Sequence, residues 1–205
     1  MVSSKVFCLG FQKTGTTSLA QALELLGYSV CGYWPFRDLA DYAQPDLADV
    51  MSSRVDTLAQ QYDAFKDTPW PLYYREMDER YPGSKFILVT RNVDSWIKSA
   101  VVDFSDWPNA IHNHIYGVPY PKGNELAWIE CYERHNAEVI DYFQGRTDFI
   151  HLHLNNGDVN WENLCGFLGH EVPDQPWPYK NSRARKQSRQ ILKRIKKKLL
   201  TLAKP

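Results

Sequence analysis

The segment from Gly10 to Ser18 (GFQKTGTTS) combines the residue types that bind phosphate. It follows a short apolar run, Lys5–Leu9, that predicts a strand, and it precedes a segment whose Leu and Ala residues recur at helical spacing. A loop between a strand and a helix N-terminus binds anions through backbone N–H groups and the positive helix end. Lys13 adds a mobile cation, and Thr16 and Thr17 add hydroxyls. The spacing therefore predicts a phosphate-binding loop.

This loop differs from the Walker A pattern, in which Lys directly follows the second Gly. Here Lys13 stands two residues before Gly15. The second strongly apolar run ends in Arg91, where a magnesium-holding Asp would be expected after the strand. The usual parts of a magnesium–nucleotide site are therefore missing, although a P-loop nucleotide kinase or NTPase stays open as an alternative.

Arg91 is the second candidate anchor for an anion. It follows Phe86–Thr90 (FILVT), a run that predicts a strand buried on both faces of a parallel sheet. Ligands bind at the carboxyl ends of such strands, and a guanidinium can hold a phosphate with two parallel hydrogen bonds. Ser99 lies eight residues later, on a helix expected over 94–102. The alternative is a surface Arg and a helix Ser without function.

These two motifs resemble those of the sulfotransferases that use 3′-phosphoadenosine 5′-phosphosulfate. Their first loop reads approximately PK[ST]GTT, and their second strand ends in Arg-Asn-Pro with a Ser eight residues after the Arg. Val93 replaces that Pro, and Ser18 stands where many cytosolic members carry Trp near the adenine. The resemblance extends over most of residues 5–181. It implies that the donor is bound by Gln12, Lys13, Thr14, Gly15, Thr16, Thr17, Ser18, Arg91 and Ser99.

Sulfuryl transfer needs in-line geometry, a cation at the leaving oxygen and help in removing the acceptor's proton. The resemblance gives the cation role to Lys13 without any metal, and the base role to Asp67, with Lys66 helping near the sulfonate. Asp67 could instead cap a helix ahead of Thr68-Pro69. The remaining candidates for acid/base work are Glu76, His112 and His114.

The alternation of strand and helix patterns predicts an α/β fold, a P-loop-type and mainly parallel sheet flanked by helices. We expect a single domain over residues 1–182 and a basic amphipathic tail over residues 183–205. Residues 35–66 are expected to be helical in pieces, and residues 103–123, rich in Pro and Asn, to form a long loop over the acceptor. His135 lies on the apolar face of a helix and is expected in the core.

Composition excludes a disordered chain, since 43% of the residues are hydrophobic and 23% are charged. No apolar run is long enough to span a membrane, and no secretory leader is recognised. Four scattered cysteines predict buried thiols and a cytoplasmic protein. The zero net charge hides an asymmetry, because ten of the 24 Lys and Arg residues and no Asp or Glu lie between Arg183 and Pro205.

Such a basic amphipathic tail is typical of a membrane-surface contact. It could also dock a partner, pack on the acidic domain or reach the donor, and no motif for specific nucleic-acid readout accompanies it. The sequence as a whole predicts transfer of a sulfonate to a hydroxyl or amine of a small-molecule, carbohydrate or lipid acceptor. A further alternative is a non-catalytic nucleotide-binding module that docks through the tail.

Overall fold

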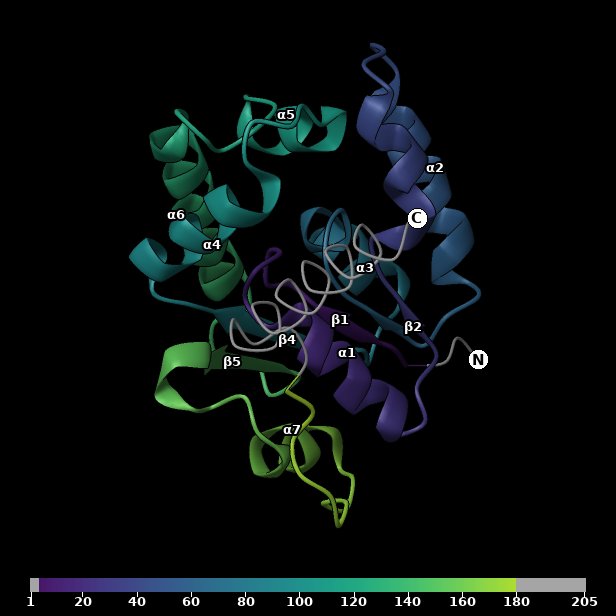
Figure 1. Ribbon diagram of the computed structural model, residues 1–205. Coiled ribbons are helices and arrows are strands. Elements are labelled where there is room, and N and C mark those ends of the chain that lie inside the picture. The colour runs from purple at the N-terminus through teal and green to yellow at the C-terminus, as the bar shows by residue number, and fades with distance from the viewer. Residues whose placement is uncertain (1–3, 180–205) are drawn as a thin grey trace, which may run out of the picture.

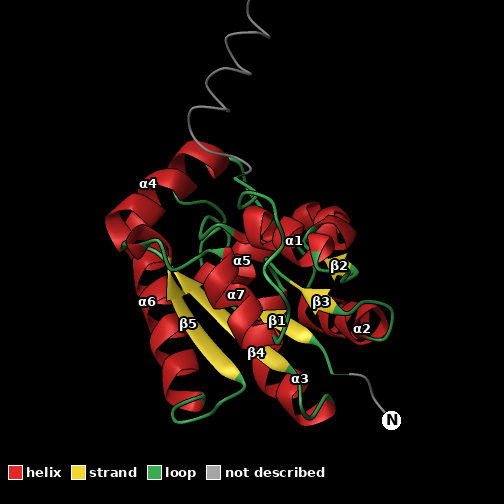
Figure 2. Cartoon of the chain, turned by 90° about the horizontal axis from the view of Figure 1, so that it is seen from below, coloured by secondary structure: helices red, strands yellow, loops and turns green. Residues whose placement is uncertain are grey.

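Five parallel strands form one sheet in the order β2-β3-β1-β4-β5 (Figure 1; Figure 2). The computed structural model describes residues 4–179, so the basic tail lies outside the described residues. The mainly parallel α/β sheet predicted from the sequence is confirmed. The strands are β1 (Val6–Cys8), β2 (Val30–Cys31), β3 (Ala64–Phe65), β4 (Lys85–Thr90) and β5 (Phe149–His153).

Both faces of the sheet are buried, because successive strand residues point to opposite faces. Phe7, Phe86 and Leu88 pack into the larger core, whereas Cys8 and Ile87 pack into the smaller one. The smaller core is completed by α1 (Thr16–Leu25) and α7 (Trp161–Leu168). The larger one is completed by α2 (Leu47–Ala59), α3 (Tyr74–Arg80), α4 (Val93–Phe104), α5 (Ala110–Tyr116) and α6 (Glu125–Tyr142).

The prediction of a continuous loop over residues 103–123 is wrong, because this segment contains α5. Asn109 accepts a hydrogen bond from the amide of His112 and so caps the helix, which ends at Gly117 in a left-handed conformation. The Pro and Asn residues that suggested a loop therefore flank a short helix. Most of residues 35–66 is helical in pieces, as expected, through the 3₁₀ helix η1 (Trp34–Asp41) and α2, but the end of this range forms the strand β3, which the prediction missed.

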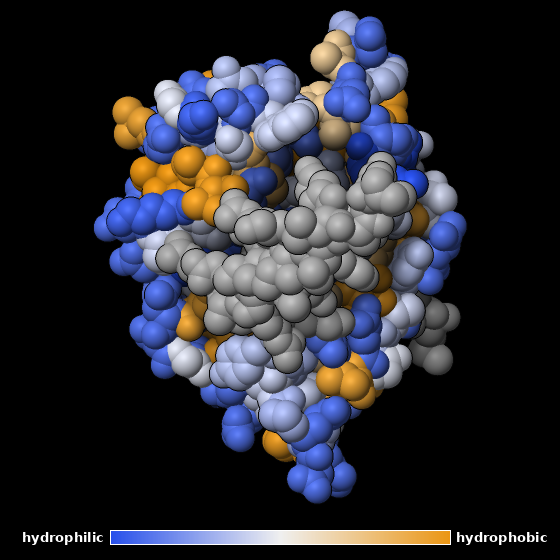
Figure 3. Space-filling model, viewed as in Figure 1, coloured by the Kyte–Doolittle hydropathy of each residue, from blue (hydrophilic) through white to orange (hydrophobic). Residues whose placement is uncertain are grey.

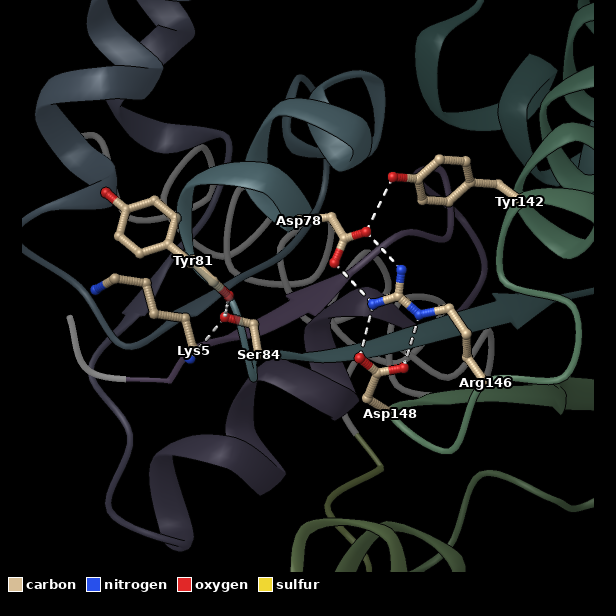
Figure 4. A network of polar contacts seen from close by, with 7 residues as sticks. All are labelled: Lys5, Asp78, Tyr81, Ser84, Tyr142, Arg146 and Asp148. Atoms are coloured by element: carbon tan, nitrogen blue, oxygen red, sulfur yellow. Dashed lines mark hydrogen bonds and ion pairs between the residues drawn. The ribbon is translucent and has the colours of Figure 1, made fainter. Parts of the chain in front are cut away.

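The amino ends of the strands are joined by a polar network (Figure 4). Arg146 donates two hydrogen bonds to Asp78 of α3, at 2.5 and 2.7 Å, and two to Asp148, at 2.9 and 2.7 Å. On the other side of the network, the Lys5 amide donates to the Ser84 hydroxyl at 3.1 Å. These contacts fix the end of the sheet opposite the phosphate loop.

The carboxyl ends of the strands carry the candidate functional residues. The chain leaves β1 toward β2 and β3 on one side and later returns to β4 and β5 on the other, so the direction of winding reverses at β1. Open α/β sheets bind ligands in the crevice formed at such a reversal. Where Figure 3 colours the surface, it is mostly hydrophilic, with a group of apolar side chains where α4 lies in Figure 1. Within residues 4–179, no helix is long and apolar enough to cross a membrane.

Candidate functional site

The backbone of the predicted phosphate loop has the shape of an anion-binding nest. A β-carbon at Gly10 would lie 2.4 Å from the carbonyl oxygen of Val89, so only glycine fits between the end of β1 and β4. Lys13 and Gly15 both have left-handed backbones, with φ of 74° and 95°, and Thr14 between them does not. Such alternation turns successive amides toward one concavity, and the amino end of α1 begins there at Thr16.

The side chains of this loop divide into those that hold it and those that face the crevice. Thr14 is buried and donates its hydroxyl to the carbonyl of Phe11 at 2.7 Å. Gln12 donates from its amide to the Tyr116 hydroxyl at 2.6 Å. Both side chains thus make hydrogen bonds within the protein, and their roles toward a donor stay predictions. Thr17 and Ser18, in the first turn of α1, are partly exposed.

Arg91 leaves the carboxyl end of β4 and contacts the phosphate loop directly. Its Nη1 donates to the carbonyl oxygen of Lys13 at 3.2 Å, and its Nε donates to the Ser95 hydroxyl at 2.8 Å. Its backbone is held by Tyr132, whose hydroxyl accepts from the Arg91 amide at 2.8 Å and donates to the Arg91 carbonyl at 3.0 Å. The two predicted anion anchors therefore lie at one site, with one joined to the other by a hydrogen bond.

One face of α4 lies along this site. Residues Ser95, Ser99 and Asp103 are spaced by four, so they lie above one another on the helix. The first of them binds Arg91, and the last forms an ion pair with the ammonium of Lys13. Ser99 is partly buried between the two, on the helix predicted to carry it, and its role toward a donor stays a prediction. The Lys13–Asp103 pair is absent from the sequence prediction, although the repeated spacing of four after Arg91 points to Asp103.

Asp67 lies next to the start of α1, where a residue acting on the transferred group would have to be. It follows β3, and its Oδ2 is 3.5 Å from both the Thr16 hydroxyl and the ammonium of Lys66. Its backbone is left-handed, with φ of 66°. Its Oδ1 accepts from the next amide, that of Thr68, at 2.9 Å. The 3₁₀ helix η2 begins only at Trp70 with Pro69 as its N-cap and without a side-chain cap, so the capping alternative is wrong.

A groove opens between the segment around η1 and α5, with a volume of about 720 Å³. Ligand pockets commonly have this size. Its polar lining residues are Asp41, Gln44, Asn109, Asn113 and His114, and Pro, Ala and Leu residues make up the rest. Among the described residues that line it, none is Lys or Arg.

Tyr33 borders this groove through one of its lining residues. Its hydroxyl accepts a hydrogen bond from the Asn109 side chain at 3.3 Å. Burial raises the pKa of Tyr33, the bond from Asn109 lowers it, and the carboxylates of Asp67 and Asp41 raise it further. The Tyr33 hydroxyl therefore stays protonated beside the groove.

The other candidates for acid/base work lie in three different surroundings. Glu76 is exposed on α3. His112 is buried against Phe104 and Trp128, and His114 lines the groove. His135 is buried, as predicted, and its Nε2 lies 2.9 Å from the Leu9 carbonyl.

All four cysteines are buried and free, and burial raises the pKa of Cys8 to about 12. They therefore behave as core residues. Within residues 4–179, no three His, Cys, Asp or Glu side chains are grouped closely enough to hold a metal ion.

The chain matches a family model described as a sulfotransferase domain, over residues 5–103 and 100–186. It is also similar to Ava biosynthesis cluster protein M of Aspergillus versicolor, with 25% identity over 214 residues. This alignment covers 85% of the chain and 80% of that protein.

Two solved structures share the fold. A sulfotransferase from Alicyclobacillus acidocaldarius superimposes with a TM-score of 0.53 and 15% identity, over 89% of this chain and 87% of that one. A shikimate kinase from Bacteroides thetaiotaomicron gives a TM-score of 0.51 and 14% identity, over 81% and 95%. Because kinase and sulfotransferase are equally similar at this level, the fold alone does not separate the two activities, whereas the family model does.

Proposed function

Because the chain belongs to the sulfotransferase family, we propose that it transfers a sulfonate group from 3′-phosphoadenosine 5′-phosphosulfate to a hydroxyl or amine of a small molecule. The observation that carries this proposal is the hydrogen bond between Arg91 and the carbonyl of Lys13, at 3.2 Å. It supports one site in which the loop binds the 5′-phosphosulfate while Arg91 and Ser99 bind the 3′-phosphate.

The reaction then follows from the positions of three side chains. Asp67 accepts the proton of the acceptor's hydroxyl or amine as its oxygen or nitrogen attacks sulfur. Lys13 stabilises the charge that develops on the oxygen of the leaving 5′-phosphate when its bond to sulfur breaks. Lys66, 3.5 Å from Asp67, adds positive charge near the sulfonate oxygens. Adenosine 3′,5′-bisphosphate leaves, and the proton stays on Asp67 until solvent removes it.

The groove between η1 and α5 is where we place the acceptor. Its polar lining supplies amides, an imidazole and the carboxylate of Asp41, with no cation among the described lining residues. An anionic acceptor would therefore lack a counter-charge and meet a like charge, which costs binding energy. This favours neutral or amine-bearing small molecules over anionic carbohydrates and anionic lipids.

The experiment is a transfer assay in the presence of EDTA, with labelled donor and matched amine-bearing, neutral and carboxylate-bearing phenols and alcohols. We expect labelled product from the first two groups, and adenosine 3′,5′-bisphosphate in equal amount. The proposal would be rejected if none of the acceptors received the labelled sulfonate and the protein instead transferred phosphate from ATP in the presence of magnesium. That result would favour the kinase alternative, which shares the fold.

A further inference from the structure

We propose that Asp103 is an internal counter-ion that competes with the donor's 5′-phosphate for the ammonium of Lys13 and thereby limits nucleotide affinity. This inference rests on the proposed function, and it concerns the regulation of the same site. The two residues are 90 positions apart in the sequence, and they meet because α4 lies along the phosphate loop. Their side chains are only 17% and 26% exposed, so solvent and salt screen this pair less than a surface pair.

The local structure of α4 does not favour a carboxylate at position 103. Asp103 lies in the last turn of the helix, where the helix dipole is negative and acidic side chains are disfavoured. The last turn of α4 contains no basic residue of its own. The positive charge that offsets this penalty comes from Lys13, in the phosphate loop.

The backbone of Lys13 is held in an unfavourable conformation next to this contact. A left-handed conformation is unfavourable for any residue with a β-carbon, and Lys13 adopts it with φ of 74°. Its carbonyl is fixed by Arg91, so the backbone stays in place while the long side chain can change partners. A bound 5′-phosphate carries more charge than one carboxylate and also accepts hydrogen bonds from the loop amides. It therefore displaces Asp103 from Lys13, and breaking this ion pair subtracts from its binding free energy.

The test is isothermal titration of adenosine 3′,5′-bisphosphate in EDTA into the wild type, Asp103→Asn and Asp103→Glu. The matched control is Asp106→Asn. It also removes one negative charge, three residues after Asp103, but from a carboxylate that forms an exposed ion pair with Lys122. We expect Asp103→Asn to bind the bisphosphate about 5- to 30-fold more tightly than the wild type. This factor corresponds to a gain of about 1–2 kcal/mol in binding free energy when the ion pair with Lys13 no longer has to be broken. Asp103→Glu, which keeps the charge, and Asp106→Asn should bind like the wild type.

Adenosine 3′-monophosphate provides a ligand control, because it lacks the phosphate that competes for Lys13. Its affinity should be the same in the wild type and Asp103→Asn. Unchanged or weaker binding of the bisphosphate to Asp103→Asn would overturn the inference. An equal gain in affinity for Asp106→Asn would also overturn it. Either result leaves the proposed function intact. If neither the wild type nor any variant binds the bisphosphate, the proposed function itself fails, and the inference fails with it.

Discussion

At the scale of single residues, the two side chains proposed to carry the chemistry share an unusual backbone. Lys13 and Asp67 have φ of 74° and 66°, a region that costs about 1–2 kcal/mol for a residue with a β-carbon. Such strain persists where the surrounding structure imposes it, and it is concentrated at functional sites. The chain therefore keeps a lysine and an aspartate at two positions where the backbone alone would favour glycine or asparagine.

Replacing Asp67 by asparagine tests the base role without disturbing this backbone, since asparagine tolerates the left-handed region. We expect kcat to fall by about 100-fold to 10,000-fold, the usual contribution of a positioned base. The affinity for adenosine 3′,5′-bisphosphate should stay near that of the wild type. Glu76→Gln is the matched control, because Glu76 is exposed on α3 and should be dispensable. Turnover by Asp67→Asn near the wild-type rate would remove Asp67 as the base.

Two replacements of Lys13 separate its chemistry from its strain. Both Lys13→Ala and Lys13→Gly should lose most of kcat while binding of the bisphosphate falls far less. Lys13→Gly should be the more stable of the two by about 1 kcal/mol in chemical denaturation, because glycine adopts this φ without a steric cost. Equal stability of the two variants would show that the backbone at position 13 is not strained.

At the scale of elements, α5 and α6 each bury a histidine, His112 and His135. Burial lowers the pKa of both His112 and His135 to about 4, although the bond to Leu9 opposes this for His135. In the unfolded chain both have a pKa of about 6.5, so between pH 6.5 and pH 4 the unfolded state binds more protons. The stability from the neutral imidazoles is therefore complete above pH 6.5 and falls as the pH is lowered toward 4.

The free energy of unfolding, measured by urea denaturation from pH 7.5 to pH 4.5, should decrease steadily below pH 6.5. The variant His112→Leu keeps a similar volume among Phe104 and Trp128 and removes one of the groups whose pKa is lowered by burial. Its stability should fall less than that of the wild type over this interval. A variant with the same pH dependence as the wild type would show that His112 is not buried in its neutral form.

The elements that the sequence predicted well are those whose pattern is set by burial. Residues 86–89 are all apolar because β4 lies between two cores, and the loop at residues 10–18 has a glycine where φ requires one. The strand β3 has only two residues, Ala64 and Phe65, too few for a period. No pattern in the sequence shows that the hydroxyl of Tyr132 holds the backbone of Arg91.

At the scale of the whole molecule, one end of the sheet is held by polar contacts and the other end carries the candidate site. The amino ends are tied together by Arg146 and Asp78 and by Lys5 and Ser84, as Figure 4 shows. The carboxyl ends bring loops from β1, β3 and β4 to one crevice. The sequence predicted both anion anchors and the candidate base in this crevice. It did not predict Asp103 or Tyr33, whose proximity to them depends on how α4 and η1 pack on the sheet.

The central claim is that the loop and Arg91 bind opposite ends of one doubly phosphorylated adenosine. Titrating adenosine 3′,5′-bisphosphate and its 5′- and 3′-monophosphates into the wild type and Arg91→Lys, in EDTA, tests it most directly. Arg91→Lys keeps the charge and loses the bidentate fork. We predict that the wild type binds the bisphosphate more tightly than either monophosphate, and that Arg91→Lys weakens the two ligands with a 3′-phosphate and spares the 5′-monophosphate. Equal weakening of all three ligands, or a bisphosphate that binds no better than the 5′-monophosphate, would contradict the claim.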